Sequence, residues 1–466
     1  MSNENNVSRR DFIRKAAAAA AIGGAAGATT KTAQANPVYK RILPQTVMGA
    51  NERIRTGHIG VGGMGKRNMQ FVLQRDDMQP IMVCDLVDLH LEQSADMTEF
   101  SGHEYPRPAK TKYFEEVIAN DDVDAVVITT PDHWHAIPAI MAAHAGKDVW
   151  CEKPLGTTIP EGRAIVEAVE QTGVVFQGGN FQRSGEHFQK VIEIVQSGHI
   201  GDIARVETWI HDQDPITGMG DKPDSEPPEG VDWERYLGWT PHVPFNENRF
   251  LYHFRWFLNY SGGKMTDWGA HLIDIVMWAM GEWDHPKTVT AAGGNYIIQD
   301  NRTTPDTLDV LYEFDDYVLS FENRVWCPVP AGNRYGIRFY GTLGILYVDR
   351  MGYEVIPHRA NEGCEPLKLE GQQEGPMNIA HWQNFADCIR SRERCICDAP
   401  IIHASTNICH AGTAAWVGGG KFEWDGENEQ FSAGETEALA KANAFINRPY
   451  ENGWSLEAPY HGDLRA

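Results

Sequence analysis

The sequence predicts an α/β protein in which a doubly wound parallel sheet is followed by an α/β domain with a large, mostly antiparallel open sheet. Three observations support this fold class. Short apolar runs alternate with helical patterns over residues 54–177, a glycine-rich turn joins the first run to the first helix, and strand-like runs over 288–340 lack intervening helices. With 466 residues, 42% of them hydrophobic, the chain is long enough for two cores.

The first domain is expected over residues 54–178. Its strands are predicted at 56–61, 80–84, 125–129, 148–151 and 174–177, and its helices at 66–74, 89–99, 137–145 and 160–172. This alternation favours a parallel sheet with helices on both faces. Such a sheet is typical of nucleotide-binding domains.

A second domain is expected over 179–420. We predict helices at 186–197, 381–392 and 405–417, and strands at 203–210, 288–298, 308–314, 317–325 and 336–340. The stretch rich in Pro, Gly and Asp that runs to about Asn248 is either a lid or substrate wall, or a surface insertion. The polar tail, 421–466, is expected to wrap the surface or a neighbouring subunit.

Residues 1–35 resemble a twin-arginine export signal. Arg9 and Arg10 precede a weakly apolar Ala/Gly stretch, and Ala33-Gln34-Ala35 fits a cleavage site between small residues. The alternative is an Ala-rich helix that carries two arginines. Because no cysteine follows the cleavage site, we expect no lipid anchor. The mature protein is therefore expected in the periplasm or otherwise exported.

Charge and cysteine content exclude several classes of partner. The formal charge of -23, with 41 Lys and Arg, argues against nucleic acid and anionic membranes, which need clustered cations. No segment after the leader is long and apolar enough to cross a bilayer. Of eight cysteines, Cys84 and Cys151 end apolar runs and are expected to be buried thiols, and Cys395 and Cys397 are too close in sequence to bond easily. Without paired C-x2-C spacing, we predict no metal.

The glycine-rich turn has the pattern of a dinucleotide fingerprint. It reads Gly60-Val61-Gly62-Gly63-Met64-Gly65, and Asp85 follows at the end of the next strand. Gly60 permits the tight turn, Gly62 lets the backbone approach a pyrophosphate, and Gly65 allows close packing of helix and strand. Asp85 would accept hydrogen bonds from the ribose and repel a 2'-phosphate, which favours NAD over NADP. The alternative is a glycine turn in an ordinary sheet.

Two further segments end predicted strands at the same sheet edge. Glu152-Lys153-Pro154 follows one strand, and Thr130-Pro131-Asp132-His133-Trp134-His135 follows another. Ligands of open α/β sheets bind at this edge. Thr130, Pro131 and His135 could therefore border the nicotinamide end of a cofactor, or only cap the next helix. Glu152 and Lys153 could equally form a surface ion pair.

A third constellation is Asp267-x3-His271, with Asp274 on the same face of a predicted helix. A carboxylate one turn from an imidazole can orient it and stabilise its protonated form, as a general base requires. The structural alternative is a set of hydrogen-bonded polar residues near a domain boundary.

With these motifs in order, residues 54–420 resemble the Gfo/Idh/MocA family of NAD(P)-dependent oxidoreductases. The resemblance implies an N-terminal Rossmann domain, a second domain that holds substrate and often mediates homo-oligomers, and sugar or inositol substrates. It implies that Lys153 is the active-site lysine and that Asp267 and His271 form its acid/base pair. It also implies that the fingerprint glycines and Asp85 hold the cofactor. Residues 255–263 look like the exported bacterial branch.

Three functions remain open from the sequence. The first is an exported sugar oxidoreductase with a tightly held NAD, because free nicotinamide is expected to be scarce outside the cytoplasm. The second is a redox-neutral NAD-dependent glycosidase, which oxidises the sugar transiently and eliminates the aglycone. The third is a sugar-binding protein without chemistry. The glycosidase needs a second acid/base, for which the sequence offers Tyr260, His211 and His253.

Overall fold

The computed structural model describes residues 53–458 except 104, 282, 284 and 328–333. These residues all belong to one unit, Arg41–Ala466. The predicted export signal, with Arg9, Arg10 and the cleavage site at 33–35, lies outside the described residues. Among the helices that are described, none combines the length and the apolarity needed to cross a membrane.

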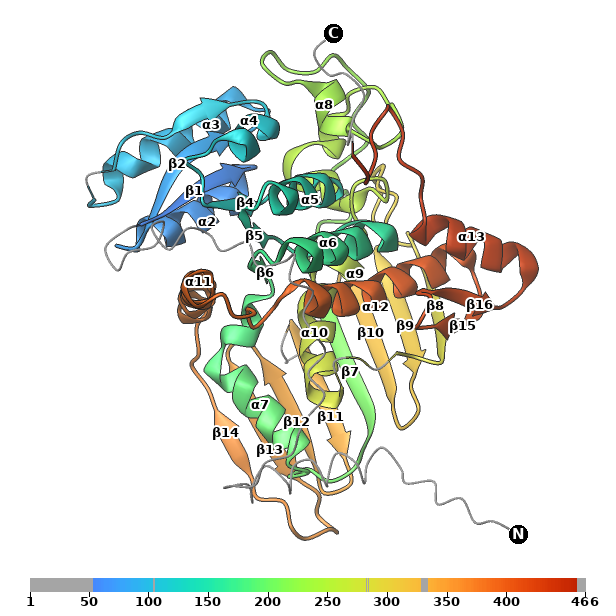
Figure 1. Ribbon diagram of the computed structural model, residues 1–466. Helices are drawn as coiled ribbons and strands as arrows, with labels where there is room; N and C mark the ends of the chain where they lie inside the picture. The colour runs from blue at the N-terminus through green and yellow to red at the C-terminus, as the bar shows by residue number, and fades with distance from the viewer. Residues whose placement is uncertain (1–52, 104, 282, 284, 328–333, 459–466) are drawn as a thin grey trace, which may run out of the picture. The chain divides into compact units, whose positions relative to one another are not determined.

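The first sheet is parallel and has the strand order β3-β2-β1-β4-β5-β6 (Figure 1). Its strands are β1 (Ile54–Ile59), β2 (Met78–Cys84), β3 (Ala109–Thr111), β4 (Ala125–Ile128), β5 (Asp148–Cys151) and β6 (Phe176–Gly178). Every residue of β4 and β5 is buried, as expected for strands covered on both faces. The strand order reverses between β1 and β4, so a crevice for a ligand forms at their carboxyl ends.

Helices connect these strands. They are α2 (Gly63–Leu73), α3 (Asp88–Asp96), α4 (Phe114–Ala119), α5 (Ala136–His144) and α6 (Ile159–Thr172). The predicted doubly wound parallel sheet is confirmed. The prediction omitted β3 and α4, because β3 has only three residues, two of them exposed, and lacks an apolar pattern.

The second sheet is mostly antiparallel, as predicted, with the order β14-β13-β12-β11-β7-β10-β9-β8-β15-β16 among the described residues. Its strands are β7 (Ile203–His211), β8 (Thr288–Gly294), β9 (Thr307–Glu313), β10 (Val318–Arg324), β11 (Tyr335–Gly341), β12 (Gly344–Asp349), β13 (Gly352–Pro357), β14 (Leu367–Leu369), β15 (Lys421–Asp425) and β16 (Gln430–Ala433). Among the strand pairs of the described residues in this sheet, the pairing of β7 with β10 is parallel and the others are antiparallel. In β9, the buried residues Leu308, Val310 and Tyr312 alternate with the exposed residues Asp309, Leu311 and Glu313.

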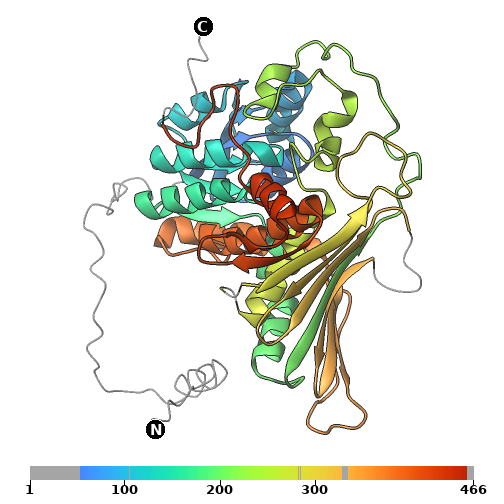
Figure 2. The same cartoon turned by 90° about the vertical axis from the view of Figure 1, so that its right-hand side faces the viewer.

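Helices cover one face of this sheet (Figure 2). They include α7 (Glu186–Gln196), α10 (Gly269–Met280) and α12 (Ala399–Gly418), whose apolar side chains join those of the strands in one core. The helix α10 is buried along nearly its whole length. It therefore holds the residues at its N-terminal end rigidly against the sheet.

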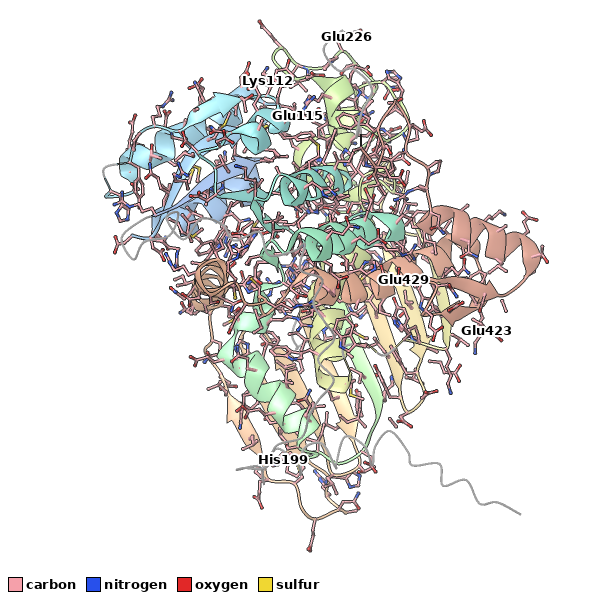
Figure 3. All side chains as sticks on the ribbon, viewed as in Figure 1. Lys112, Glu115, His199, Glu226, Glu423 and Glu429 are labelled. Carbon is pink, nitrogen blue, oxygen red and sulfur yellow. The ribbon has the colours of Figure 1, made fainter. Side chains whose placement is uncertain are left out.

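The C-terminal segment is folded into the second sheet, which differs from the predicted surface tail. β15 pairs with β8, β16 pairs with β15, and α13 (Thr436–Ile446) packs on α12. Phe422 and Trp424 alternate inward along β15, a short pattern that the polar surroundings obscure. Glu429 joins the hairpin to the helices (Figure 3), because its Oε1 lies 2.7 Å from Nε2 of His403 and its Oε2 lies 2.7 Å from Nη2 of Arg163.

One helix from the second half of the chain covers the first sheet. The side chains of α11 (Glu374–Ser391) share a core with β1, β4 and β5. The Trp382 ring stacks on that of Trp150, with centroids 3.8 Å apart and planes 2° apart. The first sheet is thus completed by residues nearly two hundred positions beyond its last strand, and the two domains share this layer.

Candidate active site

A cavity of about 650 Å³ opens at the carboxyl ends of the first sheet. Its walls come from the loops after β1, β2, β4 and β5 and from residues 235–271 of the second domain. The sequence-predicted residues that line it are Gly60, Gly62, Gly63, Met64, Asp85, Thr130, Pro131, His135, Glu152, Lys153, Asp267 and His271. The predicted site residue that does not line it is Gly65. The structure therefore brings together residues that lie far apart in the sequence.

The glycine turn has the geometry that a dinucleotide requires. Gly60 has φ +81°, and a side chain there would lie 2.6 Å from the backbone oxygen of Thr129. A Cβ on Gly65 would lie 2.0 Å from the oxygen of Gly60, so this glycine lets α2 pack against the turn. At Gly63, where α2 begins, a Cβ would meet no atom within 4 Å. The helix N-terminus thus faces open space where a pyrophosphate can approach backbone N–H groups.

Asp85 closes the far side of this turn. Its Oδ2 accepts a hydrogen bond from the Val61 N–H at 2.8 Å, and its Oδ1 accepts one from the Val87 N–H at 2.9 Å. These bonds fix the carboxylate at the end of β2, where it lines the cavity. The glycine turn and this carboxylate together fit the phosphate and ribose parts of a dinucleotide.

Polar contacts brace the two loops at the sheet edge. The Glu152 carboxylate accepts a hydrogen bond from Nδ2 of Asn68 on α2 at 2.8 Å. The His135 ring lies between two backbone oxygens, 2.7 Å from that of Pro154 and 3.0 Å from that of Thr130. His135 therefore ties the loop after β4 to the loop after β5 and fixes the position at which Lys153 leaves the sheet.

Lys153 contacts Asp267 across the cavity. Its Nζ donates hydrogen bonds to Oδ1 and to the backbone oxygen of Asp267, both at 2.7 Å. Arg255 adds a second cation, with Nε 3.5 Å from the same Oδ1. Burial alone would raise the pKa of Asp267, but the charges of Lys153, Arg255 and Lys264 outweigh it and hold that pKa well below its usual value. Asp267 is thus a permanently charged partner of the lysine.

The continuous helix that was expected to pair Asp267 with His271 is not present, although the Asp267 charge does act to raise the pKa of His271. Asp267 ends α9 (Lys264–Asp267), and α10 begins at Gly269, so the two residues do not lie one turn apart on a continuous helix. The break falls at Trp268, with φ -104°, whose ring packs against the Arg350 guanidinium 4.5 Å from its centroid. No hydrogen bond joins the Asp267 carboxylate to the His271 ring among the described residues. The carboxylate turns to Lys153 instead.

His271 lies in an apolar and cationic environment. The Phe181 ring contacts it edge-on at 5.3 Å, and its Nδ1 is buried without a hydrogen-bond partner in the described part of the chain. Burial, and after it the charges of Lys153 and Arg350, lower the pKa of His271 well below its usual value. The imidazole is therefore neutral at physiological pH and able to accept a proton.

Sequence reasoning missed several groups that line the cavity, namely Asp132, Arg255, Trp268 and Arg350. Asp132 belongs to a segment that the sequence already singled out, but its neighbours gave no reason to prefer it. None of the three residues offered as a second acid/base lines this cavity: Tyr260 is buried in an aromatic cluster, His211 pairs with Glu322, and His253 faces a separate hollow. The stretch before Asn248 supplies part of the wall through Arg235 and Tyr236.

The fold and this cavity define a dinucleotide-binding α/β protein with a second, sheet-based domain. Residues 54–180 match the Gfo/Idh/MocA oxidoreductase family with its NAD-binding Rossmann fold, and residues 188–347 match the Gfo/Idh/MocA C-terminal domain. The chain belongs to the Gfo/Idh/MocA family. The resemblance inferred from the motifs, and the expected NAD-binding domain, are confirmed.

Relatives of this chain include oxidoreductases and glycosyl hydrolase family 109 proteins. An uncharacterized oxidoreductase, YrbE of Bacillus subtilis, is 30% identical over 304 residues, which cover 64% of this chain and 74% of that protein. A glycosyl hydrolase family 109 protein of Saccharopolyspora erythraea is 33% identical over 221 residues, so the match spans about half of each protein, 45% and 47%. A protein of the same name from Stenotrophomonas maltophilia is 24% identical, with 85% of both chains covered.

Solved structures share the fold at low identity. The WlbA dehydrogenase of Bordetella pertussis, in complex with NADH and UDP-GlcNAcA, has a TM-score of 0.60 and 19% identity, covering 80% of this chain and 99% of that one. Levoglucosan dehydrogenase in complex with NADH has a TM-score of 0.58 and 20% identity, covering 78% and 97%. These likenesses extend over both sheets.

Proposed function

We propose that this protein is an exported NAD-dependent oxidoreductase that acts on a hydroxyl group of a sugar or sugar derivative. The observation that carries the proposal is one cavity lined both by the dinucleotide turn and Asp85 and by Lys153, Asp267 and His271. Family membership supplies the NAD-binding fold. The sugar class is supported by relatives and neighbours whose names include glycosyl hydrolase and levoglucosan dehydrogenase.

The fingerprint glycines and the N-terminus of α2 would hold the pyrophosphate, and Asp85 the adenosine ribose. When bound, NAD supplies a nicotinamide that takes up the hydride of the carbinol carbon. Thr130, Pro131, His135 and Glu152, at the ends of β4 and β5, would border this part of the cofactor.

The chain's own residues manage the proton and the charge. His271, neutral because of burial, accepts the proton of the substrate hydroxyl. Lys153 donates a hydrogen bond to the same oxygen and stabilises the negative charge that develops on it. Asp267 holds the Lys153 ammonium in place and balances its charge. Asp267 therefore acts on the lysine, in place of the role toward the imidazole that the sequence suggested.

Export is proposed from Arg9 and Arg10. An exported enzyme cannot draw on a cytoplasmic nicotinamide pool, so we propose that the cofactor is carried along and recycled between two substrates. Replacing both arginines by lysine should leave the full-length precursor in the cytoplasm, as cell fractionation with antibody detection would show. Normal secretion of that variant would contradict the assignment.

A second candidate is a redox-neutral, NAD-dependent glycosidase, favoured by the glycosyl hydrolase family 109 relatives. Such an enzyme oxidises the sugar, eliminates the aglycone and returns the hydride. Nicotinamide absorbance and aglycone release, recorded together with free sugars and 4-nitrophenyl glycosides, separate the two. An absorbance change without release supports the oxidoreductase, and release at a steady absorbance supports the glycosidase.

The proposed roles are tested with Lys153→Met and His271→Ala. Each variant should lose hydride transfer by about a thousandfold or more, because each removes a group that acts on the reacting oxygen. Each should retain NAD binding, measured by calorimetry, because the glycine turn is untouched. Turnover close to that of the unaltered protein in either variant would remove the assignment.

A further inference from the structure

Asp132 is a buried carboxyl group at the reacting end of the cavity to which the proposed chemistry gives no role. It begins the short helix η3 (Asp132–Trp134) after β4, at the sheet edge that also presents Lys153. Its Oδ2 accepts a hydrogen bond of 2.5 Å from Oγ of Ser261, a residue of the second domain that is itself buried. The charges of Lys153, Arg255 and Asp267 are near enough to influence the ionisation of the Asp132 carboxyl group.

The other carboxylates that line the cavity are already engaged. Asp267 pairs with Lys153, and Asp85 accepts two backbone N–H bonds. Glu152 accepts from Asn68, and Glu374 pairs with Arg350 at 2.7 Å. Within the described residues, the hydrogen-bond partner of Asp132 is a single neutral hydroxyl. Among the carboxyl groups of the described residues that line the cavity, Asp132 is therefore the one whose side chain is held by a single hydroxyl hydrogen bond.

The electrostatic environment agrees with this geometry. Burial raises the pKa of Asp132 to about 7, although the Ser261 hydrogen bond and the Arg255 and Lys153 charges act in the opposite direction. The pKa of Asp267 and that of His271 are both held well below their usual values. Near neutral pH, Asp132 is thus able both to take up and to release a proton, which neither of the other two can do.

We propose that Asp132 is a second acid/base residue of this site and that it exchanges the proton on the carbon next to the oxidised carbinol. This inference rests on the proposed function, and it supplies the group that an elimination pathway needs. It makes the redox-neutral glycosidase chemically accessible to this chain.

The proton exchange takes place in the ketone that forms when the substrate carbinol is oxidised. The adjacent C–H bond breaks, its proton passes to the Asp132 carboxylate, and its electron pair moves to the carbonyl oxygen, where Lys153 stabilises the enolate. The enolate expels the aglycone with the electron pair of the glycosidic C–O bond, and the aglycone takes a proton from water. The remaining hydroxide adds to the carbon that lost the aglycone. Asp132 then returns its proton to the carbon from which it was taken, next to the carbonyl.

The deciding variant is Asp132→Asn, assayed with 4-nitrophenyl glycosides in D2O. Deuterium incorporation at the carbon next to the carbinol, measured by NMR, and nitrophenol release should both fall by about 100-fold or more. Reduced nicotinamide should still form at a rate within about threefold of the unaltered protein and should now accumulate. In ligand-free protein, infrared spectroscopy should show a protonated-carboxyl band that titrates near pH 7 and is absent from this variant.

Ser261→Ala is the matched variant. It removes a hydrogen bond that stabilises the Asp132 carboxylate, so the pKa of Asp132 should rise. The rate of deuterium exchange, plotted against pH, should therefore fall off on the acid side at a higher pH than in the unaltered protein. If the Ser261–Asp132 hydrogen bond were only structural, its loss would not change the pH dependence of the exchange rate.

Three outcomes contradict the inference in distinguishable ways. Unchanged exchange in Asp132→Asn overturns the role of Asp132 alone. An equal loss of exchange and of hydride transfer makes Asp132 a positioning residue and also overturns it. If the unaltered protein neither reduces its nicotinamide nor releases nitrophenol across the panel, the proposed function fails, and the role of Asp132 fails with it.

Discussion

Nζ of Lys153 lies 2.7 Å from Oδ1 of Asp267 and 2.7 Å from the backbone oxygen of the same residue. The lysine leaves the edge of the first sheet, and the aspartate ends a short helix of the second domain, 114 positions away. The contact fixes the ammonium at the junction of the two domains. It also explains why, among the described residues, no hydrogen bond joins the Asp267 carboxylate to the imidazole of His271.

Asp267→Asn should slow hydride transfer by about 100-fold to 1000-fold, because the amide removes the charge that holds and balances the Lys153 ammonium. NAD affinity should change little, since the Asp267 carboxylate contacts Lys153 and not the glycine turn. Stopped-flow absorbance gives the rate, and calorimetry gives the affinity. Asp122→Asn, which alters an exposed ion pair with Arg55, is the control. A larger effect on affinity than on rate would contradict this role.

The glycine turn allows a paired test of close backbone packing. Gly65→Ala places a Cβ 2.0 Å from the oxygen of Gly60, so the turn and α2 must separate, and we expect loss of NAD binding and a lower melting temperature. Gly63→Ala meets no protein atom within 4 Å and should fold with a free energy of unfolding within about 1 kcal/mol of the original. Thermal denaturation and NAD titration check both. If the two variants had the same melting temperature and the same NAD affinity, close packing at Gly65 would not be required.

Cofactor choice is expected to depend on Asp85. Asp85→Ser removes the negative charge at the end of β2 and two hydrogen bonds to backbone N–H groups. NAD affinity should fall by about tenfold or more, and the preference for NAD over NADP should narrow, because a 2'-phosphate no longer meets a carboxylate. Fluorescence titration with both cofactors measures this. An unchanged ratio of the two dissociation constants would mean that Asp85 does not face the ribose.

Local chemistry made some parts of this site predictable from sequence. The glycine turn, Asp85 and Lys153 follow from turn geometry and from the rule that parallel strands deliver ligands to their carboxyl ends. The relation of Asp267 to His271 could not be read in this way. Helical spacing placed them on one face, whereas the helix is interrupted at Trp268, whose ring packs against Arg350 and Tyr335.

Contacts between distant segments were the other part that sequence could not supply. The stacking of Trp382 on Trp150 joins residues more than two hundred positions apart, and the local sequence around neither residue predicts this contact. Asp132 lay in a segment singled out from the sequence, yet its importance comes from burial and from Ser261, which only the folded chain brings together. The strands β15 and β16 were missed because two inward aromatics are too short a pattern.

Trp382→Ala should lower the free energy of unfolding by about 3–5 kcal/mol, because it empties a fully enclosed aromatic site between α11 and the first sheet. Trp382→Phe keeps most of the buried area and should lower the free energy of unfolding by less than Trp382→Ala does. Urea denaturation followed by far-ultraviolet circular dichroism gives both values. The order of the two variants is the critical result, and equal losses would show that the stacked indole is not the source of the stability.

Asp132 should lower the stability of the folded protein at neutral pH. Its pKa rises from an ordinary value of 3.8 to about 7 on folding, so between these values the folded state binds more protons than the unfolded state. Stability from this group is therefore present in acid and is lost as the pH rises from about 4 to about 7. The loss is nearly complete about one pH unit above 7 and is on the order of 4 kcal/mol.

Asp132→Asn removes this ionisation. The variant should melt at a higher temperature than the unaltered protein at pH 8, and the difference should shrink steadily toward pH 4. Differential scanning calorimetry at a series of pH values measures this difference in melting temperature. Asp122→Asn, on the exposed surface, should show no such pH-dependent gain. A gap that widens toward acid would mean that the Asp132 carboxylate is stabilised by folding, and the proton exchange assigned to it would then lose its physical basis.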